Sequence, residues 1–168
     1  MNKLLLILIL LSSILLGEEK NKIIVDGKSG KPMLVGICDR EAFADTNFAW
    51  WFNSGYKFYK PDINILEQLK KIDSTYTIAI VMGTWCSDSR REVPRFYKLL
   101  DAIEFPEKRV TLINVDRDKK GISVDVSKLN IERVPTFIVY RNNEEVGRII
   151  ETPKINLEED LLEILKQN

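Results

Sequence analysis

The 168-residue sequence contains no histidine and only two cysteines, and both shortages exclude familiar kinds of active site. Without histidine there is no imidazole to act as a general base, so Ser-His-Asp and Cys-His hydrolase sites are excluded. Two cysteines are too few for a four-cysteine zinc or iron–sulfur centre held by this chain alone. We therefore expect no metal and no cofactor, and a chemistry that depends on thiols, carboxylates, hydroxyls or lysines.

The sequence also lacks an excess of charge of either sign, because 25 Lys and Arg residues balance 25 Asp and Glu residues. Proteins that follow a nucleic-acid backbone concentrate Lys and Arg, so no nucleic-acid partner is predicted. Hydrophobic residues make up 45% of the chain, which excludes a disordered or low-complexity protein. The length is that of one globular domain.

One uncharged run stands out, and it lies at the N-terminus. Lys3 precedes the apolar residues 4–16, and Gly17 and a polar segment follow, which is the pattern of a signal peptide. The run is shorter than the ~20 residues that a membrane-spanning helix needs, so an N-terminal membrane anchor is the weaker alternative. We expect cleavage near Gly17 and export to the periplasm or the extracellular space, with no stable membrane span after processing. Disulfides persist in those compartments.

From residue 76 onward, apolar segments of strand length alternate with segments of helical spacing. The pattern predicts strands at 76–82, 109–115, 136–140 and 145–150, helical spacing over 93–103 and 157–165, and one or two helical turns at 124–129. The last two strands form a hairpin around Asn142 and Asn143. This order indicates a sheet with helices on its faces and a hairpin at one edge.

The front of the mature chain is less regular. Residues 18–75 are interpreted as an N-terminal, aromatic-rich helical elaboration of the same domain, and residues 76–168 as its core. The elaboration is expected to hold two short strands, at 22–25 and 33–37, and a helix at 63–72. Its aromatic residues, which are concentrated in 43–59, either pack against the sheet and helices or form a substrate-facing platform beside the active site.

Cys86 is the candidate reactive group. It follows the strand at 76–82 and comes at the first turn of a helix, where free backbone N–H groups and the helix dipole stabilise a thiolate. Arg90 and Arg91 lie four and five residues further on and can add positive charge, Arg90 being the preferred thiolate-stabilising residue. The alternatives are an inert buried thiol and arginines that simply face solvent.

The run G-T-W-C-S-D-S at 83–89, with Pro94, resembles the active-site strand-turn-helix of the thioredoxin family, in which W-C-x-x-C opens a helix and a proline lies eight residues after the first cysteine. Further on, N-V-D at 114–116 resembles the end of the family's second strand. The run I-E-R-V-P-T at 131–136 resembles the segment with its cis-proline. The landmarks keep the family's order from about residue 76 to residue 165. The longer run W-C-S-D-S-R-R-E-V-P-R-F at 85–96 is similar to that of thioredoxin-like proteins with one active-site cysteine.

This resemblance implies a thioredoxin-like α/β fold with a central mixed sheet of four to five strands flanked by helices. It also implies that Cys86, Ser89 and Pro135 form the catalytic set and that Trp85 and Val134 contact the substrate. A cis-proline at Pro135 would face Cys86, and the backbone of Val134 would pair with an extended substrate segment like an added strand.

Two positions depart from the family pattern. Ser89 replaces the second, resolving cysteine; its hydroxyl cannot attack a mixed disulfide, but it either donates a hydrogen bond to the Cys86 thiolate or is a neutral polar residue near the helix start. Ile80 stands where many thioredoxins keep a buried acid. Cys38 is a buried thiol, a structural disulfide partner or a resolving thiol that replaces the missing one.

The leading hypothesis is an exported thiol-disulfide oxidoreductase or isomerase in which Cys86 forms mixed disulfides with protein disulfide or thiol partners. Cys38, a substrate thiol or a small external thiol would then resolve them. The alternative is a non-catalytic thioredoxin-fold module that binds extended peptide or protein segments at the Pro135 groove. It is motivated by Ser89 and Ile80, and the fold itself hosts many functions.

Overall fold

The computed structural model describes residues 20–73 and 75–167. The predicted export segment, residues 1–17, lies outside this part of the chain. No helix within the described residues is long and apolar enough to cross a membrane.

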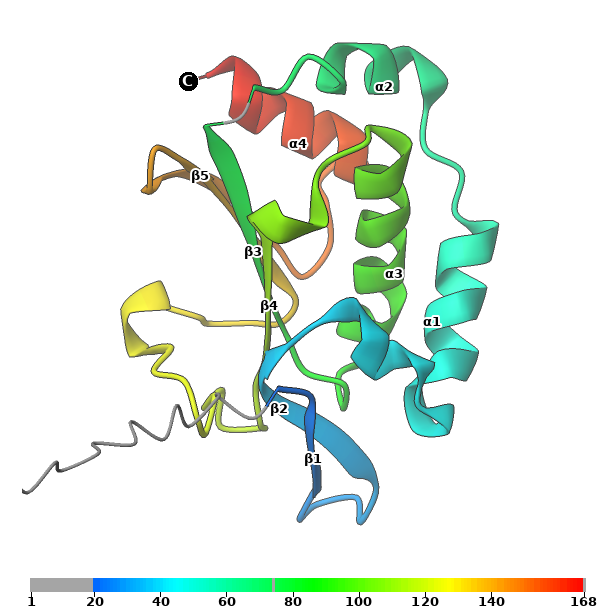
Figure 1. The fold of residues 1–168 in the computed structure, drawn as a ribbon, viewed down its shortest axis with the longest axis vertical. Coiled ribbons are helices and arrows are strands. Elements are labelled where there is room, and N and C mark those ends of the chain that lie inside the picture. The colour runs from blue at the N-terminus through cyan, green and yellow to red at the C-terminus, as the bar shows by residue number, and fades with distance from the viewer. Residues whose placement is uncertain (1–19, 74, 168) are drawn as a thin grey trace, which may run out of the picture.

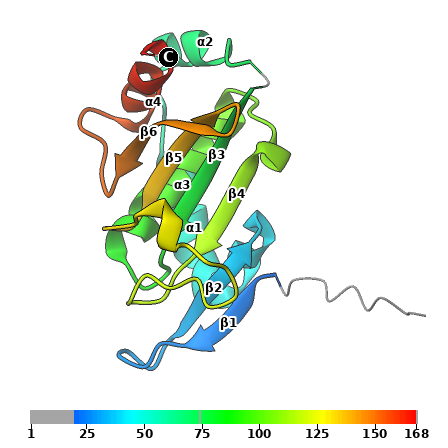
Figure 2. The same cartoon turned by 90° about the vertical axis from the view of Figure 1, so that its left-hand side faces the viewer.

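A six-stranded mixed sheet forms the centre of the fold (Figures 1 and 2). Its strands are β1 (Lys22–Val25), β2 (Pro32–Cys38), β3 (Tyr76–Met82), β4 (Val110–Asn114), β5 (Thr136–Arg141) and β6 (Glu144–Ile150). Their order in space is β1-β2-β4-β3-β5-β6, and only β3 and β4 run parallel to each other.

The prediction of four to five strands is wrong, because the N-terminal hairpin joins the same sheet. Strand β2 pairs antiparallel with β4, with Gly36 opposite Asn114 and Cys38 opposite Leu112. The residues before position 76 therefore extend the sheet beyond β4 as well as adding helices.

The α-helices of the described residues lie on one face of the sheet (Figure 1). They are α1 (Thr46–Phe58), α2 (Ile63–Leu69), α3 (Ser87–Ala102) and α4 (Leu157–Lys166). Side-chain caps hold the starts of α2 and α4: Asp62 accepts a hydrogen bond from Asn64 N, and Asn156 accepts one from Glu159 N. Short 3-10 turns are η1 (Arg40–Ala44), η2 (Glu107–Arg109) and η3 (Ser127–Leu129).

The alternation of side chains along β3 divides the core into two apolar clusters. Ile78, Ile80 and Met82 belong to the cluster that the helices cover. Ala79 and Val81 belong to a second cluster on the opposite face, which the loop between β4 and β5 crosses (Figure 2). The predicted flanking helices are present and lie on one face of the sheet, while this loop covers the other face. The one or two helical turns expected at 124–129 correspond to the single 3-10 turn η3.

The aromatic segment packs mainly inside the helical layer. Phe43 stacks on Phe52 with ring centroids 4.5 Å apart, and Phe52 meets Tyr97 of α3 edge to face at 5.8 Å. Gly55 allows α1 to approach α3, because a Cβ there would lie 2.6 Å from Cγ of Pro94. Trp50 and Phe58 are the exceptions, with 67% and 72% of their surfaces exposed.

Candidate functional site

Cys86 lies where strand β3 turns into helix α3. The seven apolar-rich residues of β3 end at the buried Met82, and the turn at 83–85 leads to Cys86, which is the N-cap of α3. Its backbone N–H donates to Gly83 O at 2.9 Å, and its carbonyl accepts from Arg90 N at 3.1 Å. The side chain is half-buried and packs at the border of the second apolar cluster. The thiol is therefore held in place and still accessible.

The Val134–Pro135 segment faces this thiol, although it is far away in the sequence. Cys86 Sγ donates to Val134 O at 3.2 Å, and the Val134–Pro135 peptide bond is cis. Pro135 O accepts from Glu151 N at 2.7 Å, and the Thr136 hydroxyl donates to Arg133 O at 2.7 Å. These bonds fix the backbone that carries Val134, so the structure brings Cys86 and the Pro135 segment together.

Ser89 has a different contact from the one expected for a thiolate partner. Its side chain is fully buried, and its Oγ accepts a hydrogen bond from Gly83 N at 3.3 Å. No hydrogen bond joins Ser89 to Cys86 within residues 20–73 and 75–167. The hydroxyl supplies an acceptor for a buried backbone N–H at the end of β3, which would otherwise be costly to leave unpaired.

Arg90 and Arg91 also have specific partners. Arg90 Nε donates to Thr84 O at 2.5 Å, which ties α3 to the turn before Cys86. Arg91 pairs with Asp88 at 2.8 Å and with Glu92 at 2.6 Å, and hydrogen bonding to Glu92 raises the pKa of Arg91. The charge of Arg91 is thus compensated on its own helix.

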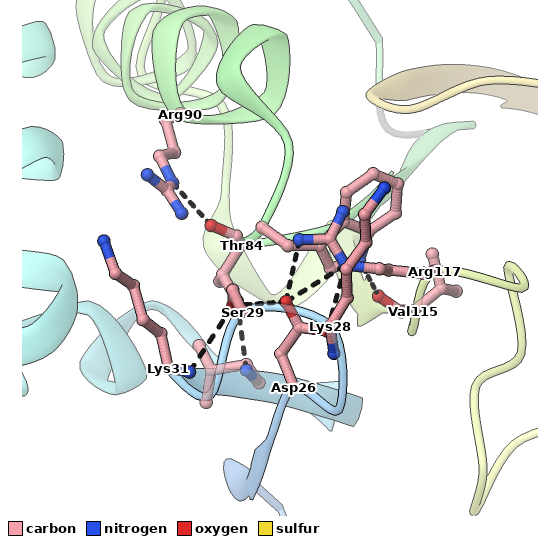
Figure 3. A network of polar contacts seen from close by, with 10 residues as sticks. Asp26, Lys28, Ser29, Lys31, Thr84, Arg90, Val115 and Arg117 are labelled. Atoms are coloured by element: carbon pink, nitrogen blue, oxygen red, sulfur yellow. Dashed lines mark hydrogen bonds and ion pairs between the residues drawn. The ribbon is translucent and has the colours of Figure 1, made fainter.

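A third cation near the site, Arg117, was not indicated by the sequence patterns and pairs with Asp26 (Figure 3). Arg117 follows β4, and its guanidinium carbon lies 5.0 Å from the centre of the Trp85 ring. Its Nε and Nη2 donate to both carboxylate oxygens of Asp26 at 2.7–3.0 Å. Hydrogen bonding to Asp26 raises the pKa of Arg117. Arg117 therefore carries its positive charge over the ring of the residue next to Cys86.

Asp26 anchors this arrangement from the β1–β2 hairpin. Its side chain is buried and accepts hydrogen bonds from Arg117, from the Ser29 hydroxyl at 2.5 Å and from Lys28 N at 3.1 Å. The Arg117 hydrogen bond is the main cause that holds the pKa of Asp26 well below its usual range. The hairpin thus holds Arg117 over Trp85.

Trp85 is fixed from two further sides. Its indole N–H donates to Val115 O at 2.9 Å. The ring also lies against Gly83, where an added Cβ would come within 2.5 Å of the indole nitrogen. Glycine at 83 is therefore needed for the position of the tryptophan next to Cys86.

Cys38 is separated from this site by the sheet. It is 5% exposed and belongs to the apolar cluster on the helical face, whereas Cys86 packs against the cluster on the other face. Burial raises the pKa of the Cys38 thiol to about 11. Both cysteines are free thiols, so the structural-disulfide alternative is wrong for this structure. A buried neutral thiol is a poor nucleophile.

A cavity of about 680 Å³ lies along the loop between β4 and β5. Val126 and Ile131 from this loop contribute to it and also pack in the cluster that Cys86 and Trp85 border. Among the described residues, no group of three or more Cys, Asp or Glu side chains is placed to hold a metal ion.

A mixed sheet, a cysteine at the start of α3 and a cis-proline segment against its sulfur define a thioredoxin-like thiol protein. The family model described as Thioredoxin matches residues 63–166. A Dictyostelium discoideum protein classed as thioredoxin-5 is 32% identical over 111 residues, which cover 66% of this chain and 99% of that protein. The chain belongs to the thioredoxin family, and this membership supports a thiol-disulfide oxidoreductase-like function in general.

Two further similarities agree with this assignment. Thioredoxin H5 of Oryza sativa subsp. japonica is 25% identical over 87 residues, which cover 52% of this chain and 59% of that protein. The crystal structure of a Pseudomonas aeruginosa protein of unknown function matches with a TM-score of 0.58 and 15% sequence identity, over 77% of this chain and 92% of that one. The latter match shows the shared fold.

Proposed function

We propose that the protein is an exported thiol-disulfide oxidoreductase or isomerase in which Cys86 is the only motif residue that forms mixed disulfides. One observation carries the proposal: the half-buried Cys86 thiol faces the Val134–Pro135 segment, while Ser89 occupies the place of the second cysteine. A thiol in this position is open to a disulfide that approaches along the Val134 backbone.

In the proposed reaction, the Cys86 thiolate attacks one sulfur of a substrate disulfide. A new bond forms between Cys86 and the substrate, the old S–S bond breaks, and the other substrate sulfur leaves as a thiolate. An extended substrate segment would pair with the backbone at Val134, whose carbonyl accepts the thiol hydrogen bond in the free protein. Because Ser89 cannot resolve the product, the thiol that does so comes from the substrate or from outside the protein.

Trapping of the mixed disulfide tests this mechanism. The reduced protein, Cys86→Ala and the matched control Cys38→Ala are mixed with a peptide that contains one disulfide, quenched with acid and weighed by intact mass spectrometry. The wild type and Cys38→Ala should carry one peptide each, and Cys86→Ala none. Equal trapping by Cys86→Ala, or no adduct on a wild-type protein whose Cys86 can be alkylated, would exclude the mechanism.

Export is supported by the apolar run at 4–16 and its polar flank. When the full chain is produced in a cell with a secretion pathway, Edman sequencing of the protein outside the cytoplasm should begin near residue 18. A protein that stays in the cytoplasm with residues 1–17 attached would contradict export, and one that stays in the membrane fraction would favour the anchor.

A peptide-binding module is the second candidate, and the fully buried Ile80 favours it because that position offers no acid to assist a second thiol. The two candidates differ in what Cys86→Ser loses. A binding module keeps its affinity for extended peptides in this variant, and its wild type forms no covalent adduct. An oxidoreductase shows adducts in the wild type only.

A further inference from the structure

A second cavity, of about 370 Å³, lies next to the active-site turn on the side of the N-terminal elaboration. Its wall combines three parts of the chain: Lys31 from the β1–β2 hairpin, Trp50 and Trp51 from α1, and Thr84 and Arg90 from the turn and helix that carry Cys86. Its volume falls in the range of small-molecule sites in proteins, which is about 300–1,000 Å³.

The cavity is positively charged. Two cations, Lys31 and Arg90, line it, and no Asp or Glu does. Arg90 uses Nε for the bond to Thr84 O, and within the described residues neither its Nη atoms nor Lys31 Nζ has a carboxylate partner. Figure 3 shows both side chains on the same side of Thr84. This local excess contrasts with the zero net charge of the whole chain, and two adjacent cations suit carboxylate groups.

The cavity lies next to the turn that carries the reactive thiol, although Cys86 itself is not part of the wall. Arg90, four residues after Cys86 on α3, bends back to Thr84 O, so its guanidinium lies at the turn before the cysteine. Thr84, two residues before Cys86, forms part of the wall. Trp50, 67% exposed, offers an aromatic surface for the apolar part of a ligand.

We propose that this cavity binds a low-molecular-weight thiol that carries carboxylate groups, and that this thiol resolves the Cys86 mixed disulfide. The inference rests on the proposed function. It follows from the site because the described chain offers no accessible second thiol: Cys38 is buried, and Ser89 takes the place of the second motif cysteine.

The proposed sequence balances with two molecules of the small thiol. The first, as a thiolate, attacks Cys86 Sγ in the mixed disulfide; the substrate leaves as a thiol after protonation, and Cys86 is joined to the small thiol. The second thiolate attacks the small-thiol sulfur of this bond, which releases the small-molecule disulfide and the Cys86 thiolate. The substrate disulfide is reduced to two thiols, and two small thiols are oxidised to one disulfide.

Rate constants for resolution test the inference. Cys86 is first loaded with a neutral peptide, and release is followed with glutathione, which carries two carboxylates, and with the neutral 2-mercaptoethanol. The ratio of the glutathione rate constant to the 2-mercaptoethanol rate constant is compared in the wild type, in Lys31→Glu and in the matched control Lys28→Glu. The exposed side chain of Lys28 belongs to the same hairpin but not to the cavity wall. The ratio should fall about five- to tenfold in Lys31→Glu and stay unchanged in Lys28→Glu. Added salt should lower the wild-type ratio.

Binding without chemistry separates this inference from the proposed function. Cys86→Ser is titrated with S-methylglutathione, which keeps both carboxylates and has no free thiol, and binding is followed by NMR chemical shifts; Lys31→Glu added to this variant should abolish saturation. If Cys86→Ser binds S-methylglutathione saturably but the wild-type protein forms no mixed disulfide, the binding site is supported and the proposed function is excluded.

The inference would be overturned, and the proposed function kept, if mixed disulfides form normally and Lys31→Glu does not change the ratio of the glutathione to the 2-mercaptoethanol rate constant. The inference would also be overturned if Lys31→Glu slowed resolution by a peptide thiol flanked by acidic residues but not resolution by glutathione. The cavity would then bind a protein substrate.

Discussion

At the scale of single residues, the Asp26–Arg117 pair connects the N-terminal hairpin with the active-site tryptophan. Its two members are 91 positions apart, and Arg117 lies over Trp85 while Asp26 is buried beneath the hairpin turn. The family motif includes neither residue. The cation beside the site is therefore held by the part of the chain that precedes the thioredoxin-like core.

The pair predicts a specific dependence of stability on pH. The Arg117 hydrogen bond lowers the pKa of Asp26 in the folded protein, so the folded state favours the ionised carboxylate. This contribution is complete above the ordinary Asp value of about 3.9 and is lost as the pH falls below it towards the folded-state pKa. Urea unfolding at several pH values should show a smaller loss of unfolding free energy between pH 5 and pH 2 in Asp26→Asn than in the wild type. The control is Asp118→Asn, at an exposed position, which should lose as much unfolding free energy between pH 5 and pH 2 as the wild type.

Cys38 and Cys86 should differ sharply in reactivity. Because burial raises the pKa of Cys38 to about 11, only about one Cys38 in a thousand is a thiolate at pH 8. Iodoacetamide should therefore label Cys86 in the native protein and Cys38 only after unfolding in urea, as peptide mass mapping would show. Equal labelling of both cysteines in the native state would restore Cys38 as a candidate resolving thiol.

What the sequence reveals at this scale depends on distance along the chain. Trp85 and Cys86 form one local motif, and Pro135 lies in a second, so their types and spacing are readable without a structure. Asp26 and Arg117 are charged residues in ordinary polar surroundings, and nothing local shows that they pair. The contact of Ser89 with Gly83 N is equally hidden, because a serine near a helix start has several available partners.

At the scale of elements, the contact between α1 and α3 is sensitive to one glycine. Gly55→Val would place side-chain atoms into Pro94, whose Cγ is already within 2.6 Å of an ideal Cβ. Overpacking of this kind costs about 1–3 kcal/mol of unfolding free energy. Ser54→Val, on the exposed face of the same helix, should change stability by about 0.5 kcal/mol or less. Chemical denaturation of both variants checks the difference, and equal stabilities would mean that α1 can move away from α3 at little cost.

Strand β2 is tied to the active-site turn by a single side-chain bond. Leu34 N donates to the Thr84 hydroxyl oxygen at 3.1 Å, and both residues are buried. Thr84→Val keeps the shape and removes the acceptor, so we expect a loss of about 1–3 kcal/mol of unfolding free energy. Thr77→Val, a half-buried position on β3, is the matched control and should be nearly neutral. A neutral Thr84→Val would show that this bond does not hold the hairpin to the site.

The elements themselves were predictable to different degrees for a physical reason. Strand β3 has the predicted bounds, because it is buried on both faces and therefore apolar almost throughout. In the loop at 116–135 the predicted helical turns shrink to the single 3-10 turn η3. The apolar residues of this loop cover the second face of the sheet, and their spacing follows that surface instead of a longer helical repeat. Both N-terminal strands were predicted, but not that they join the central sheet, because a short, exposed β1 and the glycine-containing β2 do not show which strand they pair with.

At the scale of the whole molecule, the N-terminal elaboration and the thioredoxin-like core should unfold together. Strand β2 is hydrogen-bonded to β4, and the aromatic residues of α1 share one apolar cluster with α3 and β3. Two variants give separate signals: Trp50→Phe with Trp85→Phe leaves Trp51 in the elaboration, and Trp50→Phe with Trp51→Phe leaves Trp85 at the site. In urea, the fluorescence midpoint of each should coincide with the far-ultraviolet circular dichroism midpoint of the same variant, as two-state unfolding requires. If the Trp51 fluorescence changes at clearly lower urea than the circular dichroism of the same variant, the elaboration is a separate unit. The active-site turn would then keep its structure without the hairpin that holds Asp26.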